Sequence, residues 1–399
     1  MIREVVFETI KYMWRSKKNR LFMILTLGVM LAYSIVLLPN TAGLEEVDVQ
    51  QLEREMLGNE QTYKDALLKG QTVPAVMTGT SAYEAARTEF FNQRQLLTAL
   101  QQGDARRYLE INYRPDITER VIVQESLDLN VPVMGREAEN VFQPIKNQAY
   151  IYEVDALNFH IVHDRTSLQQ IHLFLIGLGP VLLCLGAIFM ISDITVKDRK
   201  LTTQKAGVPM KWAGYLFIQS ITAVSFVLLF YLISAGIFFI LNGLLYGFGT
   251  LSLPVGLFQF DQTNQSIYTS PLELFSIGQF LIRIIPFFLL ILYLISKLNT
   301  IFSLLFKQEV VVLISGAFMI LFQQLYYGVE TTELLGINIS WFPQTYLDFG
   351  KIVTGRVNEA MLEGDFYMRG LLVLSITILI AEVLVYLTAK HITRQKFVR

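Results

Sequence analysis

The sequence predicts an all-α polytopic membrane protein with six transmembrane helices, an N-terminal amphipathic interfacial helix and a mostly helical extracellular domain. Of its 399 residues, 53% are hydrophobic and 17% are charged, whereas a soluble domain is about 25% charged. The mean hydropathy is +0.43. Apolar runs of about 18 residues or more recur along the chain, and each is long enough to cross roughly 30 Å of hydrocarbon.

The first 20 residues predict a cytoplasmic amphipathic helix, followed by a first span at 21–39. Apolar residues recur at helical spacing in this segment, and basic residues are interleaved with them. This pattern is typical of a helix that lies on the inner membrane surface with its bases near anionic lipid headgroups. The apolar run that follows is too long for a signal peptide and has no small-residue cleavage site, so we expect an uncleaved anchor.

Residues 40–170 predict an extracellular domain. The segment contains 20 acidic and 12 basic residues, and two stretches of it have amphipathic helical spacing. Its best strand candidate is 120–123. The one cysteine of the chain, Cys184, lies inside a span, so the domain can form no internal disulfide and must be held by packing.

The rest of the chain alternates between apolar spans and short polar segments. Basic residues are concentrated in every second polar segment between the spans. By the positive-inside rule, this predicts that the termini and the 193–212 loop are cytoplasmic. The predicted segments are span 171–192, cytoplasmic coupling loop 193–212, span 213–240, extracellular loop 241–276, span 277–298, cytoplasmic loop 299–309, span 310–328, extracellular loop 329–369, span 370–389 and cytoplasmic tail 390–399.

A search for chemistry finds no catalytic constellation. There is no G-x-x-x-x-G-K-[ST] motif and no H-E-x-x-H motif, so we expect neither ATP hydrolysis nor zinc catalysis by this chain. His160 and His163 could share a helical face, but no cysteine or paired carboxylate completes a metal site. We therefore expect no enzyme activity, no metal, no cofactor on this chain and no nucleic-acid partner.

Two charged residues fall inside predicted spans. Arg283 lies in the span 277–298 and Glu382 in the span 370–389. Each costs a few kcal/mol at depth unless it is paired or hydrated. Either they form a polar pair or line an intramembrane path, or Arg283 extends outward to the interface and Glu382 bonds a neighbouring helix.

The loop between the second and third spans is polar, basic and compatible with a helix. Lys197 to Ala206 can form a short exposed helix, which Gly207 and Pro209 would end. Such a helix, held at both ends by spans, would transmit force well; the alternative is a solvated basic loop that only satisfies the charge rule. The candidate coupling residues are Lys197, Asp198, Arg199, Lys200, Leu201, Thr202, Lys205 and Pro209.

Two stretches carry a family resemblance. The first is Asp198-Arg199-Lys200-Leu201-Thr202-Thr203, followed by Pro209, after the second span; the second is Trp341-Phe342-Pro343-Gln344-Thr345-Tyr346-Leu347, followed by Lys351-Ile352-Val353-Thr354-Gly355, before the last span. With the order of the spans, they resemble permeases of ATP-binding-cassette (ABC) transporters of the type-2 exporter class. The resemblance is strongest to the Gram-positive subfamily with a large extracellular domain between spans one and two. Asp198 stands where that family more often has glutamate.

The resemblance implies a half-transporter in a bacterial plasma membrane. The expected partners are a second permease copy or a paralogue, the lipid bilayer and cytosolic ABC ATPase subunits, which would bind the ATP and Mg²⁺. The expected cargo is amphiphilic: a peptide, an antimicrobial or a lipid. The alternative function is a non-transporting sensor or mechanotransmission subunit coupled to an ATPase.

Overall fold

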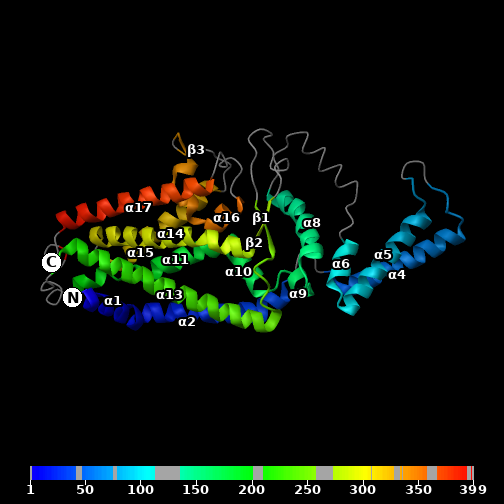
Figure 1. The fold of residues 1–399 in the computed structure, drawn as a ribbon, viewed down its shortest axis with the longest axis horizontal. Coiled ribbons are helices and arrows are strands. Elements are labelled where there is room, and N and C mark those ends of the chain that lie inside the picture. Colours follow the sequence, from blue (N-terminus) through cyan, green and yellow to red (C-terminus); the bar gives the residue numbers. More distant parts are fainter. Residues whose placement is uncertain are drawn as a thin grey trace.

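The computed structural model is an elongated helical protein, with a long bundle at one end and the outer helices at the other (Figure 1). The two chain termini lie together at the end of the bundle farthest from the outer helices. The structure describes residues 2–41, 47–74, 79–112, 135–200, 210–257, 273–306, 308–327, 333–334, 336–356, 366–392 and 397.

Five helical stretches among these residues are long and apolar enough to cross a membrane. Three of them are single helices: α13 (Trp212–Tyr246), α14 (Ile277–Leu305) and α17 (Phe366–His391). The stretch Lys17–Asn40 comprises α2 (Lys17–Ala32), a π-helical turn η1 (Tyr33–Leu37) and α3 (Leu38–Asn40). The stretch Gly179–Arg199 comprises α11 (Gly179–Ile191) and most of a 3-10 turn, η2 (Val196–Lys200). These helices support a multi-pass α-helical membrane protein.

The sixth expected span, 310–328, falls on α15 (Glu309–Tyr327). Its stretch Glu309–Phe322 is apolar but shorter than the other five. A sixth span therefore stays a prediction.

The N-terminal helix α1 (Ile2–Arg15) is amphipathic, and one of its faces packs on the bundle. Val5, Thr9 and Met13 are spaced by four residues and buried, and α1 packs on α13. Phe7 and Trp14, by contrast, are 65% and 62% exposed. One face thus docks on the bundle, while the exposed face is partly apolar and suits a membrane surface.

The segment 171–192, expected as the second span, is not one continuous helix. It forms α10 (Ser167–Ile176) and then α11, with Gly177 and Leu178 between them. In a continuous helix the Pro180 ring would clash with the carbonyl of Ile176, four residues earlier. The last helical residue of α10 is Ile176, so the break lies where the proline requires it.

The segment before the last span is buried inside the bundle. It forms two 3-10 turns, η3 (Ile339–Trp341) and η4 (Pro343–Leu347), and a short helix α16 (Phe349–Thr354). The turns contact α11, α15 and α17, and α16 contacts α10, α14 and α17. Gly350 meets the backbone of Leu175 and Ile176 so closely that a Cβ there would overlap it. This part of the expected extracellular loop 329–369 is therefore packed against the broken second helix.

The described part of the outer region 40–170 is mostly helical. α4 (Val49–Leu68) and α5 (Ala82–Gln102) form a hairpin that projects away from the bundle (Figure 1). Ser81 and Glu84 form a capping box at the start of α5, which satisfies backbone donors that the helix leaves unpaired. α6 (Ala105–Asn112), α8 (Gly135–Glu153) and α9 (Phe159–Val162) follow. The strand candidate 120–123 lies outside the described residues.

Two small antiparallel sheets complete the described structure. β1 (Pro254–Leu257) pairs with β2 (Glu273–Ser276), and β3 (Glu333–Leu334) pairs with β4 (Ile337–Asn338). The first sheet packs on α8 and α14, so it helps to join the outer helices to the bundle.

Candidate functional site

The first half of the loop after α11 folds into the bundle. We call residues Asp193 to Arg199 the inner corner, since they lie at the end of the bundle that carries the termini. Asp193, Lys197 and Asp198 are only 5%, 6% and 1% exposed. The expected exposed helix over 197–206 is wrong for Lys197 and Asp198, which are buried in the 3-10 turn η2.

Asp198 is held by α13. The Tyr215 hydroxyl donates to its Oδ2 at 2.9 Å, and Gln219 Nε2 donates to the same oxygen at 3.1 Å. Tyr215 and Gln219 are four residues apart, so they share one face of α13. Because a buried carboxylate is costly without donors, these two bonds fix η2 against this helix.

Arg199 is held by the end of α14. Its Nη2 donates to the carbonyl oxygens of Ser303 at 3.3 Å and Leu304 at 3.0 Å. These carbonyls belong to the last turn, where a cation also complements the helix dipole. The guanidinium carbon lies 4.2 Å from the centre of the Phe397 ring, which adds a cation–π contact from the C-terminal tail.

Asp193 and Lys197 are held by the two N-terminal helices. Lys18 Nζ lies 3.0 Å from Asp193 Oδ1, and the Tyr12 hydroxyl donates to Asp193 Oδ2 at 2.9 Å. Lys197 Nζ lies 3.6 Å from the centre of the Tyr12 ring. Burial and the Asp193 carboxylate raise the pKa of Tyr12 above its ordinary value, so its hydroxyl keeps the proton that it donates.

The inner corner thus connects α1, α2, α13, α14 and Phe397 through one short turn. The coupling candidates Lys197, Asp198 and Arg199 act as its anchors. The side chain of Lys200, and Leu201, Thr202, Lys205 and Pro209, lie outside the described residues. The coupling role of all eight candidates stays a prediction. Sequence reasoning missed Tyr215 and Gln219, although two polar residues four apart in an apolar span were a usable signal.

The intramembrane charge Glu382 pairs with Lys297, and Arg283 takes no part in that pair. Lys297 Nζ lies 2.8 Å from Glu382 Oε1 and is fully buried. The Tyr293 hydroxyl donates to the same carboxylate, and the Phe217 ring centre lies 4.7 Å from Lys297 Nζ. One cation therefore joins α13, α14 and α17.

Arg283 lies near the outer end of α14. Its guanidinium carbon is 5.4 Å from the centre of the Phe275 ring. It is 14 residues from Lys297 in the same helix, a rise of about 21 Å. The polar pair that includes Arg283 is wrong, whereas the alternative that Glu382 bonds a neighbouring helix agrees with the structure. By the positive-inside rule alone, Lys297 counts only as a basic residue near the end of a span.

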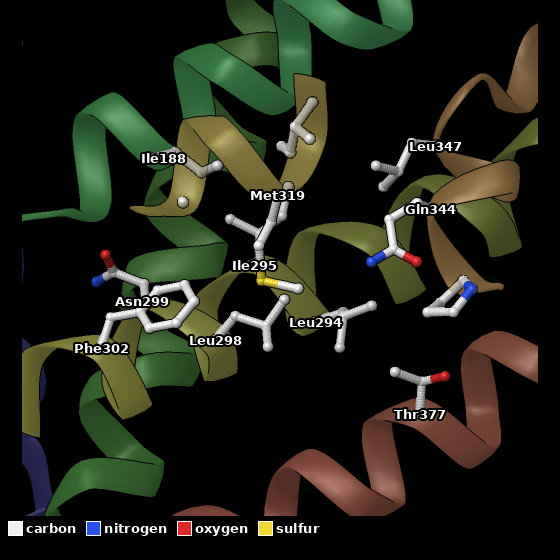
Figure 2. A pocket seen from close by; sticks show the side chains of 13 residues that line it. Ile188, Leu294, Ile295, Leu298, Asn299, Phe302, Met319, Gln344, Leu347 and Thr377 are labelled. Atoms are coloured by element: carbon white, nitrogen blue, oxygen red, sulfur yellow. The ribbon is translucent and has the colours of Figure 1, made fainter. Parts of the chain in front are cut away.

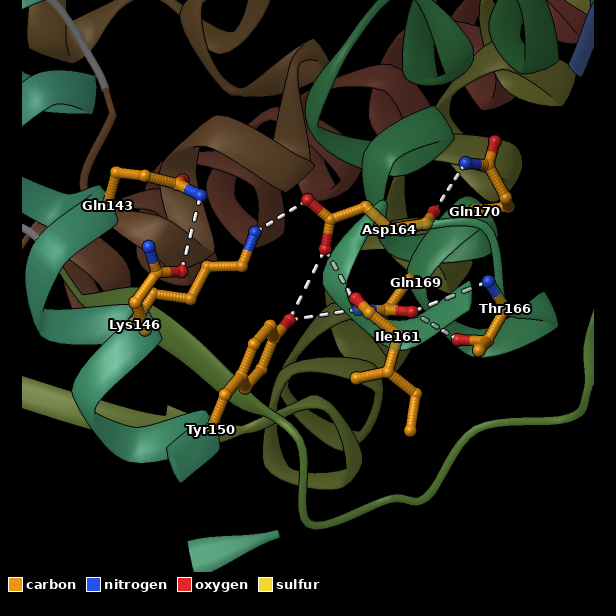
Figure 3. A network of polar contacts seen from close by, with 9 residues as sticks. Gln143, Lys146, Tyr150, Ile161, Asp164, Thr166, Gln169 and Gln170 are labelled. Atoms are coloured by element: carbon orange, nitrogen blue, oxygen red, sulfur yellow. Dashed lines mark hydrogen bonds and ion pairs between the residues drawn. The ribbon is translucent and has the colours of Figure 1, made fainter. Parts of the chain in front are cut away.

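A second polar corner lies at the outer end of the bundle, around Asp164 (Figure 3). We call residues Asp164 to Gln170 the outer corner. Lys146 Nζ of α8 lies 2.5 Å from Asp164 Oδ2, Gln169 Nε2 donates to Oδ1 at 2.8 Å, and the Tyr150 hydroxyl donates to it at 3.3 Å. Asp164 is the one non-glycine residue of the described chain with positive φ, at 55°.

The outer corner also reaches two membrane helices. Gln170 Nε2 donates to the Asp164 carbonyl at 2.6 Å, and the Tyr33 hydroxyl of η1 donates to Gln170 Oε1 at 2.7 Å. Asn242 Nδ2 of α13 donates to the carbonyl of Arg165 at 3.1 Å. This corner therefore joins the outer helix α8 to η1, α10 and α13.

The two histidines considered for a metal make ring contacts in this region. His160 packs against Tyr246 and His163 against Phe159. Burial, and next the Arg165 charge, lower the pKa of His160. Within the described residues no group of three or more His, Cys, Asp or Glu side chains could hold a metal ion.

No family model, characterised protein or solved structure matches this chain.

Proposed function

We propose that this chain is the membrane-spanning permease subunit of an ABC transporter. In this proposal it exports an amphiphilic cargo, a peptide, an antimicrobial or a lipid, and a separate cytosolic subunit hydrolyses the ATP. The observation that carries the proposal is the inner corner. Because Asp198 and Arg199 bond α13 and α14 directly, a displacement of the loop would move both helices together.

The hydrogen bonds of the inner corner support a rigid connection between the loop and the membrane helices, which we call the lever, and not a flexible one. Asp198 has two donors from α13, and Arg199 has two acceptors in the last turn of α14. In the proposal the ATPase binds the second half of the loop, around Lys200, Leu201, Thr202, Lys205 and Pro209, on the cytoplasmic side. Differential ATPase binding would then bias the bundle between two shapes.

The break between α10 and α11 gives that lever a hinge. The inner part of the second helix can follow the inner corner, while α10 is held by α16 and the outer corner. The proposal includes six spans with both termini cytoplasmic in a plasma membrane, and a second copy or related permease to complete the path. It resembles the type-2 exporter class in the segment order and in Trp341 to Gly355.

A sensor or mechanotransmission subunit is the second candidate. The observation that favours it is the outer corner, in which the outer helix α8 bonds Asp164 through Lys146 and Tyr150. A ligand that moved the outer helices would therefore act on α10, η1 and α13. In this role the ATPase would report ligand binding without moving cargo.

The ATPase partnership is tested by purifying the chain from its native membranes. We expect an ATP-hydrolysing subunit to co-purify, and Lys205→Glu to remove most of that activity while the chain still elutes as a single species. Lys69→Glu, an exposed site at the end of the outer hairpin, is the matched control. Equal ATPase activity in both variants, or none with the unmodified chain, would contradict the proposal.

A transport assay separates the two candidate functions. The co-purified complex is placed in proteoliposomes with a fluorescent amphipathic peptide and a fluorescent phospholipid. ATP-dependent movement of either probe across the bilayer supports export. ATP hydrolysis that responds to the probes without moving them supports the sensor.

A further inference from the structure

A cavity of about 70 Å³ lies inside the bundle, between α11, α14, α15, η4 and α17 (Figure 2). Pockets that bind drug-sized ligands measure about 300–1,000 Å³, so this cavity is too small for an amphiphilic cargo. In the proposed function a second copy completes the path, and two copies must then share a surface. The hairpin of α4 and α5 has the properties of such a surface.

The hairpin packs along a seam. Its seam residues are three or four positions apart on each helix, which is the spacing of a coiled coil. They are Leu52, Met56, Asn59, Tyr63 and Ala66 on α4, and Ala86, Phe90 and Gln93 on α5. Asn59 Nδ2 donates to Gln93 Oε1 at 3.0 Å, and the ring centres of Tyr63 and Phe90 are 5.4 Å apart. Asn59 and Gln93 therefore lie at the same height along the two helices.

The two flanks of the hairpin differ in polarity. A residue directly after a seam residue is turned by about 100° to one side, and because the helices are antiparallel, these positions of α4 and α5 share one flank. We call it the apolar flank, since it carries Leu57, Leu67 and Phe91, which are 54%, 54% and 42% exposed. The residues directly before the seam form the opposite flank, which carries no large apolar side chain: Gln51, Glu55, Gly58, Thr62 and Asp65 on α4, and Ala85, Glu89 and Asn92 on α5. This asymmetry indicates that the apolar flank contacts a partner.

Symmetry fixes how a second copy would meet this flank. Two copies in one bilayer have the same orientation, so the two-fold axis that relates them is perpendicular to the membrane. The hairpin projects along the long direction of the bundle (Figure 1), and the axis therefore runs along the hairpin. Rotation about it places α4 of one copy against α5 of the other, antiparallel and at unchanged height. The four helices would form a bundle with the apolar flanks inside.

The charges of the apolar flank suit this pairing. α4 contributes two acids and one base, whereas α5 contributes two bases: Glu53, Glu60 and Lys64, and Arg87 and Arg94. Arg94 directly follows Gln93, so in the second copy it lies at a height between Glu53 and Glu60 of the first. Opposite charges that face each other in this way favour one partner and one register.

One contact of this arrangement joins like charges. Lys64 comes to the height of Arg87 of the second copy, but Lys64 Nζ is already 2.6 Å from Glu60 Oε1, and the Arg87 guanidinium lies 5.7 Å from the centre of its own Phe91 ring. The repulsion is thus weakened within each chain. Because both copies are held in one membrane, their effective concentration is high, and a small surface suffices.

We propose that a second copy of this chain docks on the apolar flank, so that the two outer hairpins form a four-helix bundle outside the membrane. Leu57, Leu67 and Phe91 form its core, and Arg94 pairs with Glu53 and Glu60 of the other copy. The inference rests on the second copy of the proposed function and adds the place where the copies meet. It requires neither the ATPase nor a cargo.

The test is cross-linking in isolated membranes between two full-length copies with different tags. One copy carries Glu53→Cys and the other Thr98→Cys. Glu53 is six residues before Asn59 and Thr98 is five after Gln93, so the two sites face each other at nearly the same height. Thr98 is on the apolar flank because it lies two turns after Phe91. We expect a short bismaleimide reagent to join the two tags.

A second cysteine pair is the matched control. Thr62→Cys and Glu89→Cys lie at matching heights on the opposite flank, and both sites are exposed. This pair should not join the tags. The native Cys184 is buried, so unmodified copies give the background. Reaction with a monofunctional maleimide dye shows that each introduced cysteine is accessible.

Charge reversal tests the register. Arg94→Glu in both copies faces Glu60 with a like charge and should lower the cross-linking yield about fivefold, the upper value for an exposed ion pair. Adding Glu60→Arg should restore the yield. The proposal is overturned if neither cysteine pair cross-links, if both do so equally, or if Arg94→Glu leaves the yield unchanged. Co-purification of the ATPase in those cases would leave the permease assignment intact and reject only this docking surface.

Discussion

The two corners hold opposite ends of the broken second helix, and they do so with different partners. At the inner corner, Asp198 receives two neutral donors from one membrane helix, α13. At the outer corner, Asp164 receives a lysine and a tyrosine from the outer helix α8. The inner acid thus fixes the loop to the bundle, whereas the outer acid fixes a separate region to it.

The acid of the inner corner is also more deeply buried than the acid of the outer corner. Asp198 is 1% exposed, while the Asp164 side chain is 21% exposed and the Lys146 side chain 8%. Since screening by water weakens a partly exposed ion pair, the outer joint should be the weaker of the two. The comparison predicts a rigid inner lever and a more easily opened outer contact, separated by the break at Gly177.

The largest loss of stability should come from a substitution at the close contact between α16 and α10. Gly350→Ala would push α16 away from the backbone of Leu175 and Ile176, with an expected loss of roughly 3 kcal/mol or more. The measurement is the temperature at which half of the detergent-purified protein remains monodisperse. Gly236→Ala, where a Cβ meets nothing within 4 Å, is the control and should not lower it.

If Gly350→Ala were as stable as Gly236→Ala, α16 would not hold α10 in place. The two corners would then not be parts of one packed unit, and the comparison between them would lose its basis.

The next effect tests the inner corner. Asp198→Ala leaves the Tyr215 hydroxyl without its carboxylate acceptor and weakens the bonding of Gln219, with an expected cost of about 2–3 kcal/mol. Thermal stability should fall, and hydrogen exchange at the start of α13 should rise. Asp155→Ala, which removes an exposed acid, should change neither. Unaltered exchange in Asp198→Ala would show that η2 is not anchored there.

The long helices of this fold were predictable from the sequence, because the length of an apolar run predicts a membrane-spanning helix directly. Four of the expected spans have matching helical stretches, α11 covers most of a fifth, and α1 has the expected amphipathic spacing. The position of the break after Ile176 is harder to predict, since Gly177, Leu178, Gly179 and Pro180 lie within one apolar run that hydropathy reads as continuous. Only the steric effect of Pro180 on the carbonyl four residues earlier reveals it.

The partners of the buried charges could not be predicted in the same way. Lys297 lies near the predicted end of a span, so the positive-inside rule counts it as a flanking base. Its partner Glu382 lies 85 positions later, in another helix. A pairing of that kind depends on which helices are neighbours, and apolar periodicity does not encode it. The same limit hid the contacts of Asp198 with α13.

A smaller effect is expected at the outer corner. Lys146→Met should cost about 2 kcal/mol, between the values for exposed and fully buried ion pairs, because Gln169 and Tyr150 still donate to Asp164. Hydrogen exchange should rise in α10 and remain unchanged in α11. Lys64→Met removes the exposed pair with Glu60 in the outer hairpin and should change neither segment. Equal increases in α10 and α11 would mean that the break does not separate the two corners.

The smallest effect should appear at the intramembrane pair, provided both charges are removed together. Glu382→Leu alone leaves the fully buried Lys297 without its counter-ion, and a broken buried pair costs about 3–5 kcal/mol. The double variant Lys297→Met with Glu382→Leu removes both desolvation costs and should come within about 1 kcal/mol of the unmodified chain. A double-mutant cycle on thermal stability measures this coupling. Additive losses would mean that the two charges stabilise the bundle independently, and the joint between α14 and α17 would then rest on apolar packing alone. A strong coupling instead makes this pair a third polar joint of the bundle, with a fully buried lysine and a half-buried glutamate.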